Sequence, residues 1–243
     1  MRFLIENLSV EILDLLGSRF VQAGCKDPKP LISLQGKPLL GHVLERLFQA
    51  GIEEVELLLN EEPFFDPVEA YVSRLPKGFR VHTSRKTTQT SCESFCFLME
   101  RLGRPPFLLS TVDTIFPEVA LREFLQVESY PSSCRLVLAA THFVHDEKPL
   151  WVEVNEEGKV LRLGEAVVTK EAVTAGLYLV LQDLIEQASR GPFAALRDFL
   201  GELVADGGNV WAKAFPMALD IDGPEDVRVA ESLLDGNGVG ALA

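Results

Sequence analysis

The alternation of apolar, strand-like runs with helical stretches constrains the fold of this chain more than any other feature. "PFLLSTVD" (106–113) is a continuous apolar run and "CRLVLAAT" (134–141) is another apolar segment, both typical of strands that are buried on both faces. "EVELLL" (54–59) is a further predicted strand. Apolar residues recur at helical spacing over 40–48, before that strand, and another helix is expected from about 90 to 101, after it. Strands and helices that alternate in this way form βαβ units around a parallel sheet. We therefore predict a three-layer α/β/α fold with a mostly parallel central sheet.

The remaining elements follow from shorter patterns. Thr90 and Glu93 have the spacing of a capping box. Gly51 is placed to end the helix expected over 40–48. Residues 150–163 alternate apolar and polar side chains around a Glu-Glu-Gly turn, which predicts a β-hairpin. Further strands are expected at 9–15, 79–83, 175–181 and 210–216, and further helices at 64–75, 117–127, 182–189, 193–205 and from Pro224.

The length of the chain fits one large domain. The 243 residues contain 47% hydrophobic and 24% charged side chains, a balance that can fill a sizeable core. We see neither an internal repeat nor a linker, so we expect a single domain over 1–234 and a disordered tail over 235–243. No apolar run approaches the roughly 18 residues of a membrane span, and no secretory signal is evident, so a cytoplasmic location is expected.

Charge limits the classes of partner. A net charge of −13 argues against nucleic acid or an anionic membrane as the main partner. Residues 15–38 nevertheless carry four basic side chains and one acidic side chain. This positive segment indicates either a site for a small anionic ligand or a solvated loop. A glycine turn at Gly17, followed by Arg19 and Lys29, is suited to phosphate, because backbone N–H groups and cations can both approach its oxygens.

Two acids end predicted strands at the edge where ligands bind in open α/β sheets. Asp113 closes the "LLSTVD" run, and Asp220 stands in "ALDIDGPEDV". Carboxylates in such positions can hold Mg²⁺ against a triphosphate. Each acid has a simpler interpretation: Asp113 can cap a turn, and Asp222 with Gly223-Pro224 can form the turn into the last helix.

Other polar residues are less specific. Ser91 and Ser94 lie at a helix start, where they serve either as base or phosphate contacts or only as capping residues. Cys92 and Cys96 are one helical turn apart, but the four histidines are scattered, so two buried thiols are favoured over a zinc site.

The ordered set of motifs resembles the nucleotidyltransferases with a GT-A-like, Rossmann-like fold, the sugar-1-phosphate nucleotidylyltransferases and molybdenum-cofactor guanylyltransferase-like enzymes. "GSRF…KDPKPLISLQGKPLL" is similar to the family opening LAAGxGxR, PKxL and GKPL. "LLSTVD", "VTAGLYLV" and "LDIDGPEDV" resemble the family's metal-binding strand, its "naGiY" strand and its closing motif. The likeness spans about 12–234.

The resemblance implies a Mg²⁺-dependent transfer of NMP from an NTP to a phosphorylated small acceptor, with release of pyrophosphate. It implies a nucleotide-binding half (about 1–115) and an acceptor-binding half (about 116–234). Arg19 and Lys29 would hold phosphates, Asp113 and Asp220 would hold Mg²⁺, and the backbone of Leu16, Gly17 and Ser18 would bind the triphosphate. Ser91 and Ser94 would lie near the base, and Gly176 near the acceptor. Lys148, before the hairpin and outside the family motif, is a further candidate for contact with the acceptor.

Two departures from the family pattern leave alternatives open. Asp14 and Leu15 replace small residues of the glycine loop, and Glu165-Ala166-Val167 stands where the sugar-phosphate enzymes carry Glu-Lys-Pro. A catalytically impaired nucleotide-binding or sugar-nucleotide-binding regulator of the same fold is therefore the first alternative, and a GT-A glycosyltransferase the second. The sequence leaves the base, the acceptor and the oligomeric state open, a homodimer being one alternative.

Overall fold

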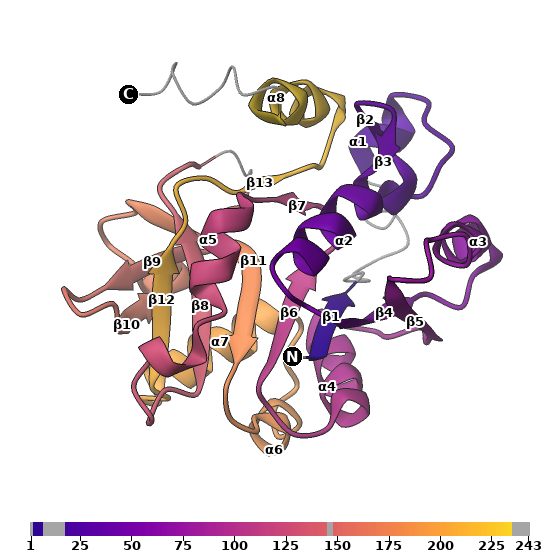
Figure 1. Cartoon of the computed structure of the whole chain (residues 1–243). Coiled ribbons are helices and arrows are strands. Elements are labelled where there is room, and N and C mark those ends of the chain that lie inside the picture. The colour runs from indigo at the N-terminus through magenta and orange to yellow at the C-terminus, as the bar shows by residue number, and fades with distance from the viewer. Residues whose placement is uncertain (1, 7–17, 145–147, 235–243) are drawn as a thin grey trace.

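A central mixed sheet organises the chain, with strands in the order β10-β9-β11-β6-β1-β4-β5 and with β8 and β12 branching from β11 (Figure 1). The computed structural model describes residues 2–6, 18–144 and 148–234, and within these residues the sheet has nine strands. The first half of the sheet is parallel: β1 pairs with β4 and β6, and β4 pairs with β5. These strands are β1 (Arg2–Glu6), β4 (Glu54–Leu59), β5 (Arg80–Arg85) and β6 (Phe107–Thr111).

The second half contributes antiparallel pairs. β11 runs antiparallel to β6 on one side and to β8 on the other, while β12 pairs in parallel with β8. The predicted hairpin is confirmed as the antiparallel pair of β9 and β10. The bounds are β8 (Leu136–Thr141), β9 (Trp151–Val154), β10 (Val160–Leu163), β11 (Ala172–Val180) and β12 (Val210–Ala214).

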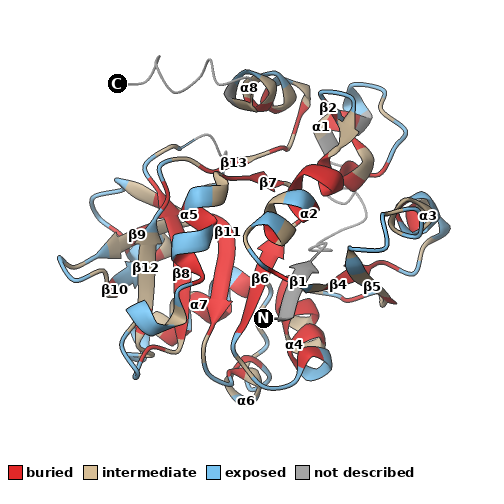
Figure 2. Ribbon diagram, viewed as in Figure 1, coloured by how far each residue is buried: buried red, intermediate tan, exposed pale blue. Residues whose placement is uncertain are grey.

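Helices cover both faces of the sheet, which gives the predicted three layers. One buried cluster joins α2, α3 and α5 to one face, and a second joins α4, α6 and α7 to the other (Figures 1 and 2). The helices are α1 (Ser18–Gln22), α2 (Leu39–Gln49), α3 (Asp66–Val72), α4 (Ser91–Leu102), α5 (Glu118–Phe124), α6 (Ile185–Ala188), α7 (Leu196–Ala205) and α8 (Pro224–Leu234). Short 3₁₀ helices span Lys29–Leu31, Pro63–Phe65, Val127–Ser129 and Gly164–Ala166.

The residues expected to begin and end helices make the contacts and adopt the conformations that the sequence predicts. The Thr90 side chain accepts a hydrogen bond from the Glu93 backbone N–H, and the Glu93 carboxylate accepts one from the Gln89 N–H, which fixes the start of α4. Gly51, just beyond α2, has φ +90°, a conformation that favours glycine after a helix. The predicted strand over 54–59 coincides with β4.

A third apolar cluster lies at the carboxyl-end edge of the parallel strands. Two short antiparallel pairs contribute to it, β2 (Ser33–Leu34) with β3 (Lys37–Pro38), and β7 (Thr114–Ile115) with β13 (Leu219–Asp220). Its buried residues are Phe20, Ile32, Leu34, Leu39, Ile115, Leu219, Ile221 and Ala230. Each fully buried Leu, Ile or Phe side chain contributes roughly 1.5–3 kcal/mol. The cluster therefore fastens α8 and residues 18–39 to the edge where Asp113 lies.

Some expectations fall outside the described residues. The first strand expected at 9–15 and the tail 235–243 are among them; the strand at the centre of the sheet is β1. The single-domain assignment over 1–234 stays a prediction. Within residues 2–6, 18–144 and 148–234, no helix is both long and apolar enough to cross a membrane.

Candidate active site

Lys29 joins two carboxylates at the carboxyl end of β6. Its Nζ lies 2.5 Å from Asp113 Oδ2 and 2.5 Å from Asp222 Oδ1. Lys29 is only 7% exposed, so this contact is largely shielded from water. Such shielding strengthens the attraction between opposite charges relative to a surface ion pair. A cation bridging two acids at the ligand edge of an α/β sheet is suited to binding a charged ligand.

Local structure explains why these three side chains meet. Pro28 and Pro30 flank Lys29 and favour the 3₁₀ turn that carries it, since proline fixes φ near −65°. On the other side, β13 pairs with β7, directly after Asp113, and the Ile221 N–H donates to the Asp113 carbonyl at 3.1 Å. This pairing brings Asp222 beside Asp113.

The charges stabilise one another. Burial lowers the pKa of the Lys29 ammonium, but Asp113 and Asp222 outweigh that effect and raise it above its ordinary value. Burial alone would raise the pKa of Asp113, yet Lys29 and a hydrogen bond from Thr111 bring it below its usual range. Lys29 is therefore a cation and Asp113 an anion at neutral pH.

Asp220 is close to this pair but has a different partner. Its Oδ1 accepts a hydrogen bond from Thr114 Oγ1 at 2.5 Å, and Thr114 Oγ1 is 2.6 Å from Thr111 Oγ1. Burial and the Asp113 carboxylate raise the pKa of Asp220 to about 7, against the Thr114 hydrogen bond. Asp113 and Asp220, predicted together from the sequence, are thus neighbours, whereas Lys29 bridges Asp113 to Asp222.

Gly176 lies against the same threonines. Its φ is +65°, and a Cβ built there would lie 2.7 Å from Thr114 Oγ1 and 2.8 Å from Thr111 Oγ1. The register of β11 against β8 shifts between Thr174 and Tyr178, on either side of this glycine. The absence of a side chain lets β11 approach the Thr111–Thr114 turn, so Gly176 is part of the site's wall.

Arg19, in α1, contacts the start of α8. Its NH1 lies 3.8 Å from both Glu225 Oε1 and Asp226 Oδ2. Asp226 is 1% exposed, and its Oδ2 accepts hydrogen bonds from the N–H groups of Asp222 and Gly223 at 2.9 and 2.7 Å. The "DGPED" segment therefore contacts both predicted phosphate-binding cations, Lys29 through Asp222 and Arg19 through Asp226.

Two residues at this edge of the sheet were not singled out from the sequence. Asp222, which contacts Lys29, was interpreted only as a turn residue. Asn60 directly follows β4, and it is 5% exposed. Its Oδ1 accepts hydrogen bonds from the Glu62 N–H and Thr87 Oγ1, both at 3.1 Å, which fixes the orientation of the amide. Its place at a strand's carboxyl end was the available signal.

Ser91 and Ser94 are turned into the protein. Ser91 Oγ accepts the Leu196 N–H at 2.7 Å, and Ser94 Oγ lies 2.6 Å from Thr88 Oγ1 and donates to the Thr90 carbonyl. Both serines are at least 96% buried. These contacts give the hydroxyls structural roles, so they do not support the base contacts predicted for them.

The other predicted residues are placed only in part. Leu16 and Gly17 lie outside the described residues, and Ser18 is the first residue of α1. Lys148 is exposed, and its carbonyl accepts a hydrogen bond from Arg197 NH1 at the start of α7. Its role at the acceptor stays a prediction.

The donor set fits a hard divalent cation. Asp113 and Asp222 already converge on one positive group, and Asp220 adds a third carboxyl beside them. Mg²⁺ is commonly held by one or two carboxylates together with substrate phosphates and waters. Within the described ranges, no three His, Cys, Asp or Glu side chains are grouped around one metal position. A Mg²⁺ ion would thus need nucleotide oxygens in addition to Asp113 and Asp222 or Asp220.

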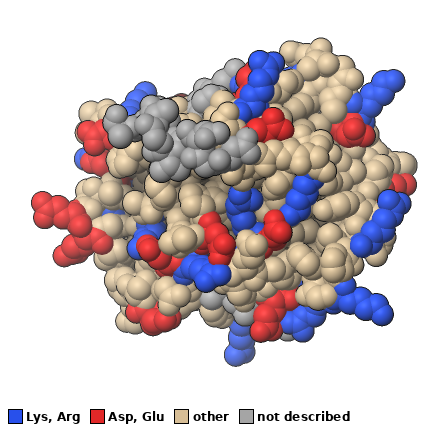
Figure 3. Space-filling model, turned by 45° about the horizontal axis from the view of Figure 1, so that its top comes forward, with Lys and Arg blue, Asp and Glu red and all other residues tan. Residues whose placement is uncertain are grey.

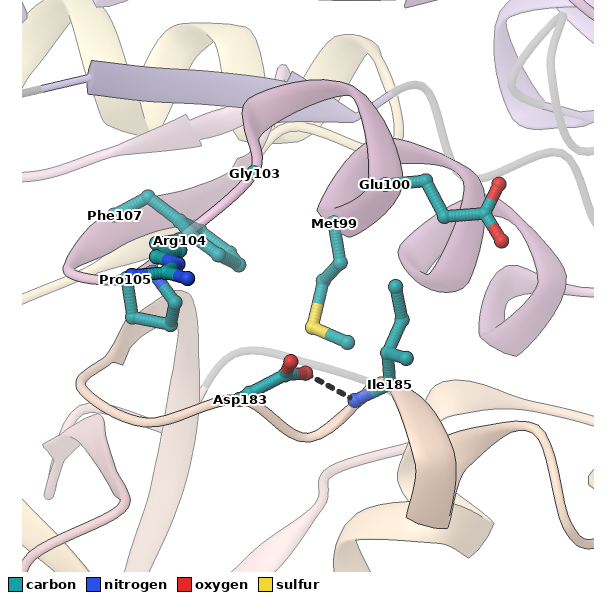
Figure 4. A pocket seen from close by; sticks show the side chains of 8 residues that line it. All are labelled: Met99, Glu100, Gly103, Arg104, Pro105, Phe107, Asp183 and Ile185. Atoms are coloured by element: carbon teal, nitrogen blue, oxygen red, sulfur yellow. Dashed lines mark hydrogen bonds between the residues drawn. The ribbon is translucent and has the colours of Figure 1, made fainter.

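The site edge also carries both kinds of charge. With this end of the molecule turned forward, Lys and Arg side chains are interspersed with Asp and Glu (Figure 3). By contrast, a pocket of about 250 Å³ is lined by the end of α4, the residues leading into β6, Asp183 and the first residue of α6, Ile185 (Figure 4). Since it lies where β6 begins, this pocket is at the opposite end of the sheet from Asp113.

Sequence comparison assigns residues 16–162 to the MobA-like NTP transferase domain. The chain belongs to this family. The match includes Arg19, Lys29 and Asp113 of the site described above. An NTP transferase is also the class of enzyme that the sequence motifs predict, and the family assignment confirms it.

Named relatives of the MobA-like domain support the same class. The chain is 24% identical over 231 residues to N-acetylmuramate alpha-1-phosphate uridylyltransferase of Caulobacter vibrioides, covering 90% of this chain and 93% of that protein. It is 23% identical over 223 residues to mannose-1-phosphate guanylyltransferase 1 of Arabidopsis thaliana, covering 86% of this chain. The chain spans about three fifths of the length of the plant relatives that it matches.

A solved structure confirms the predicted fold. The inositol-1-phosphate CTP transferase from T. maritima superposes with a TM-score of 0.76 and 22% sequence identity, covering 100% of this chain and 98% of that one. The chain therefore has the α/β fold of the nucleotidyltransferases.

Proposed function

We propose that the chain transfers an NMP group from an NTP to a phosphorylated sugar or polyol, with Mg²⁺ as cofactor and pyrophosphate as the second product. The observation that carries the proposal is the convergence of Lys29, Asp113 and Asp222 at the carboxyl end of β6. The names of the relatives above differ in the base, but each names a phosphate monoester of a sugar or polyol as acceptor.

The proposed chemistry needs little beyond positioning and charge. An oxygen of the acceptor phosphate attacks the α-phosphorus, a new P–O bond forms, and the bond from the α-phosphorus to the bridging oxygen breaks as pyrophosphate leaves. The acceptor phosphate is ionised at neutral pH, so no general base is required. Lys29 and Arg19 would orient the phosphates and balance the charge that builds on the leaving group. When bound by Asp113 with Asp222 or Asp220, Mg²⁺ would supply further charge neutralisation.

The charged residues of the site favour an active enzyme over a catalytically impaired regulator. Lys29 and Asp113 are held in one buried network and keep their charged forms at neutral pH, as the reaction requires. The regulator alternative rests on Asp14 and Leu15, which lie outside the described residues.

A binding screen tests the proposal. Thermal shift with each of four NTPs and Mg²⁺, followed by calorimetry on the best, should identify one nucleotide, because a ligand that binds the native state raises its stability by mass action. Asp113→Ala should abolish the effect of Mg²⁺, whereas Asp183→Ala, at the opposite end of the sheet, should not. Failure of every NTP to bind, together with no effect of Asp113→Ala, would refute the proposal.

A further inference from the structure

Lys29 contacts two of the three carboxylates that could hold a divalent cation at this site. The Lys29 ammonium stands 2.5 Å from an oxygen of Asp113 and 2.5 Å from an oxygen of Asp222, and its side chain is 9% exposed. A Mg²⁺ ion bound to the same oxygens would lie at about 2.1 Å from each. Two positive groups cannot share so small a volume, since their repulsion is large in a shielded site.

Lys29 contacts one carboxylate on each side, Asp113 and Asp222. Asp113 follows β6, whose pairing with β1 and β11 fixes its backbone. Asp222 is held by Asp226, which accepts its N–H. The lysine, by contrast, carries its charge on a flexible four-carbon stem. The backbones that carry the two carboxylates are therefore held in place, and the long side chain of Lys29 is the member of the network with the reach to change partners.

We infer that Lys29 acts as a built-in counter-ion that competes with the divalent cation for Asp113 and Asp222 and yields only when a polyphosphate offers it new partners. Metal and nucleotide then bind in a coupled manner: the phosphates attract Lys29 away from the carboxylates, and the carboxylates become free for the metal. Free metal alone binds weakly, because it must displace a paired ammonium. The inference rests on the proposed function and adds to it a reason why the site takes metal together with nucleotide.

The coupling between metal binding and polyphosphate binding is reciprocal. If a polyphosphate raises metal affinity by some factor, the metal raises polyphosphate affinity by the same factor. Removing Lys29 should weaken the coupling to the part that comes from phosphate oxygens bound directly to the metal. It leaves Asp113 and Asp222 without their counter-ion, so metal binding in the absence of polyphosphate should become tighter, by on the order of 10-fold.

The test measures Mn²⁺ affinity by electron paramagnetic resonance, with and without inorganic pyrophosphate. Wild-type protein should bind Mn²⁺ weakly alone and at least about 10-fold more tightly with pyrophosphate. Lys29→Met should bind Mn²⁺ alone about 10-fold more tightly than wild type, and pyrophosphate should raise its Mn²⁺ affinity by a smaller factor than it does in wild type. Lys29→Arg, which keeps the charge, should resemble wild type. Lys213→Met is the matched control, since Lys213 lies on β12, away from the site, and pairs with Glu123 of α5.

The outcomes separate this inference from the proposed function. If Asp113→Asn binds Mn²⁺ with pyrophosphate as tightly as wild type, the proposed function fails. If Asp113→Asn loses that binding but Lys29→Met gains no affinity for Mn²⁺ alone, only the competition is refuted. Circular dichroism checks that Lys29→Met folds, and Lys29→Gln replaces it if it does not. Wild-type protein that binds Mn²⁺ equally well with and without pyrophosphate refutes the competition without any variant.

Discussion

The Lys29 ammonium lies 2.5 Å from the Asp222 carboxylate, although 193 residues separate them in the chain. The contact joins the loop before α2 to the segment before α8, and both segments pack on the same apolar cluster. Two segments from opposite halves of the sequence thus meet at the carboxyl end of β6. Several consequences can be measured.

Asp226→Ala should lower both stability and nucleotide affinity. The Asp226 carboxylate accepts the N–H groups of Asp222 and Gly223, so its loss removes a helix cap, which costs roughly 0.5–2 kcal/mol. Asp198→Ala is a matched control, because Asp198 accepts the Ala195 N–H at the start of α7. Urea unfolding should show a loss for both variants, but calorimetry should show weaker NTP binding only for Asp226→Ala. Equal NTP affinities of the two variants would show that Asp226 does not contribute to nucleotide binding.

Gly176→Ala should be more destabilising than Gly207→Ala. Both glycines have positive φ, +65° and +74°, so each alanine carries a backbone cost of roughly 1–2 kcal/mol. Only at Gly176 does the new Cβ meet Thr111 and Thr114, which adds roughly 1–3 kcal/mol of overpacking. Denaturant unfolding of the two variants gives the difference directly. A Gly176→Ala variant as stable as Gly207→Ala would contradict the close approach of β11.

Stability should fall as the pH drops below about 6.5. His42 is 8% exposed, its Nε2–H donates to the Leu34 carbonyl at 2.8 Å, and burial lowers the pKa of His42 below 6.5. The unfolded chain then takes up a proton first, so this contribution is complete above the unfolded pKa and decreases toward the folded one. Urea unfolding at pH 7.5 and 5.5 measures the effect. His42→Gln should lose less unfolding free energy than wild type between these two pH values. A variant that loses as much as wild type would exclude His42 as the source of the pH dependence.

Cys96 should be alkylated well below the pH at which ordinary thiols react. A hydrogen bond from Cys92 lowers the pKa of the Cys96 thiol to about 7, and Ser189 Oγ donates to the same sulfur at 3.7 Å. Iodoacetamide labelling followed by mass spectrometry should show a rate that rises through pH 7. Cys134 is the internal control, because burial raises its pKa to about 11. Cys92→Ala should shift the Cys96 midpoint upward; an unshifted midpoint would contradict the role of Cys92.

β4 and β6 were predictable because the apolar residues of each leave a recognisable run in the sequence, and Asp113 follows from the end of β6. β1 was not among the strands expected from the sequence, and the exposed positions of β5 leave a weaker pattern. The contact between Lys29 and Asp222 could not be predicted, since β7 and β13 are two residues long and have no periodicity to detect. Ser91 was correctly placed at a helix start, but only packing against α7 decides that its hydroxyl points inward.

Pyrophosphate release tests the central claim most directly. With the NTP selected by binding and a panel of sugar and polyol phosphates, wild-type protein and Mg²⁺ should release pyrophosphate only when both substrates are present. Lys29→Ala should abolish the release, and Lys213→Met should not. A folded protein that binds the NTP but releases no pyrophosphate with any acceptor, or a Lys29→Ala variant that retains full activity, would contradict the account.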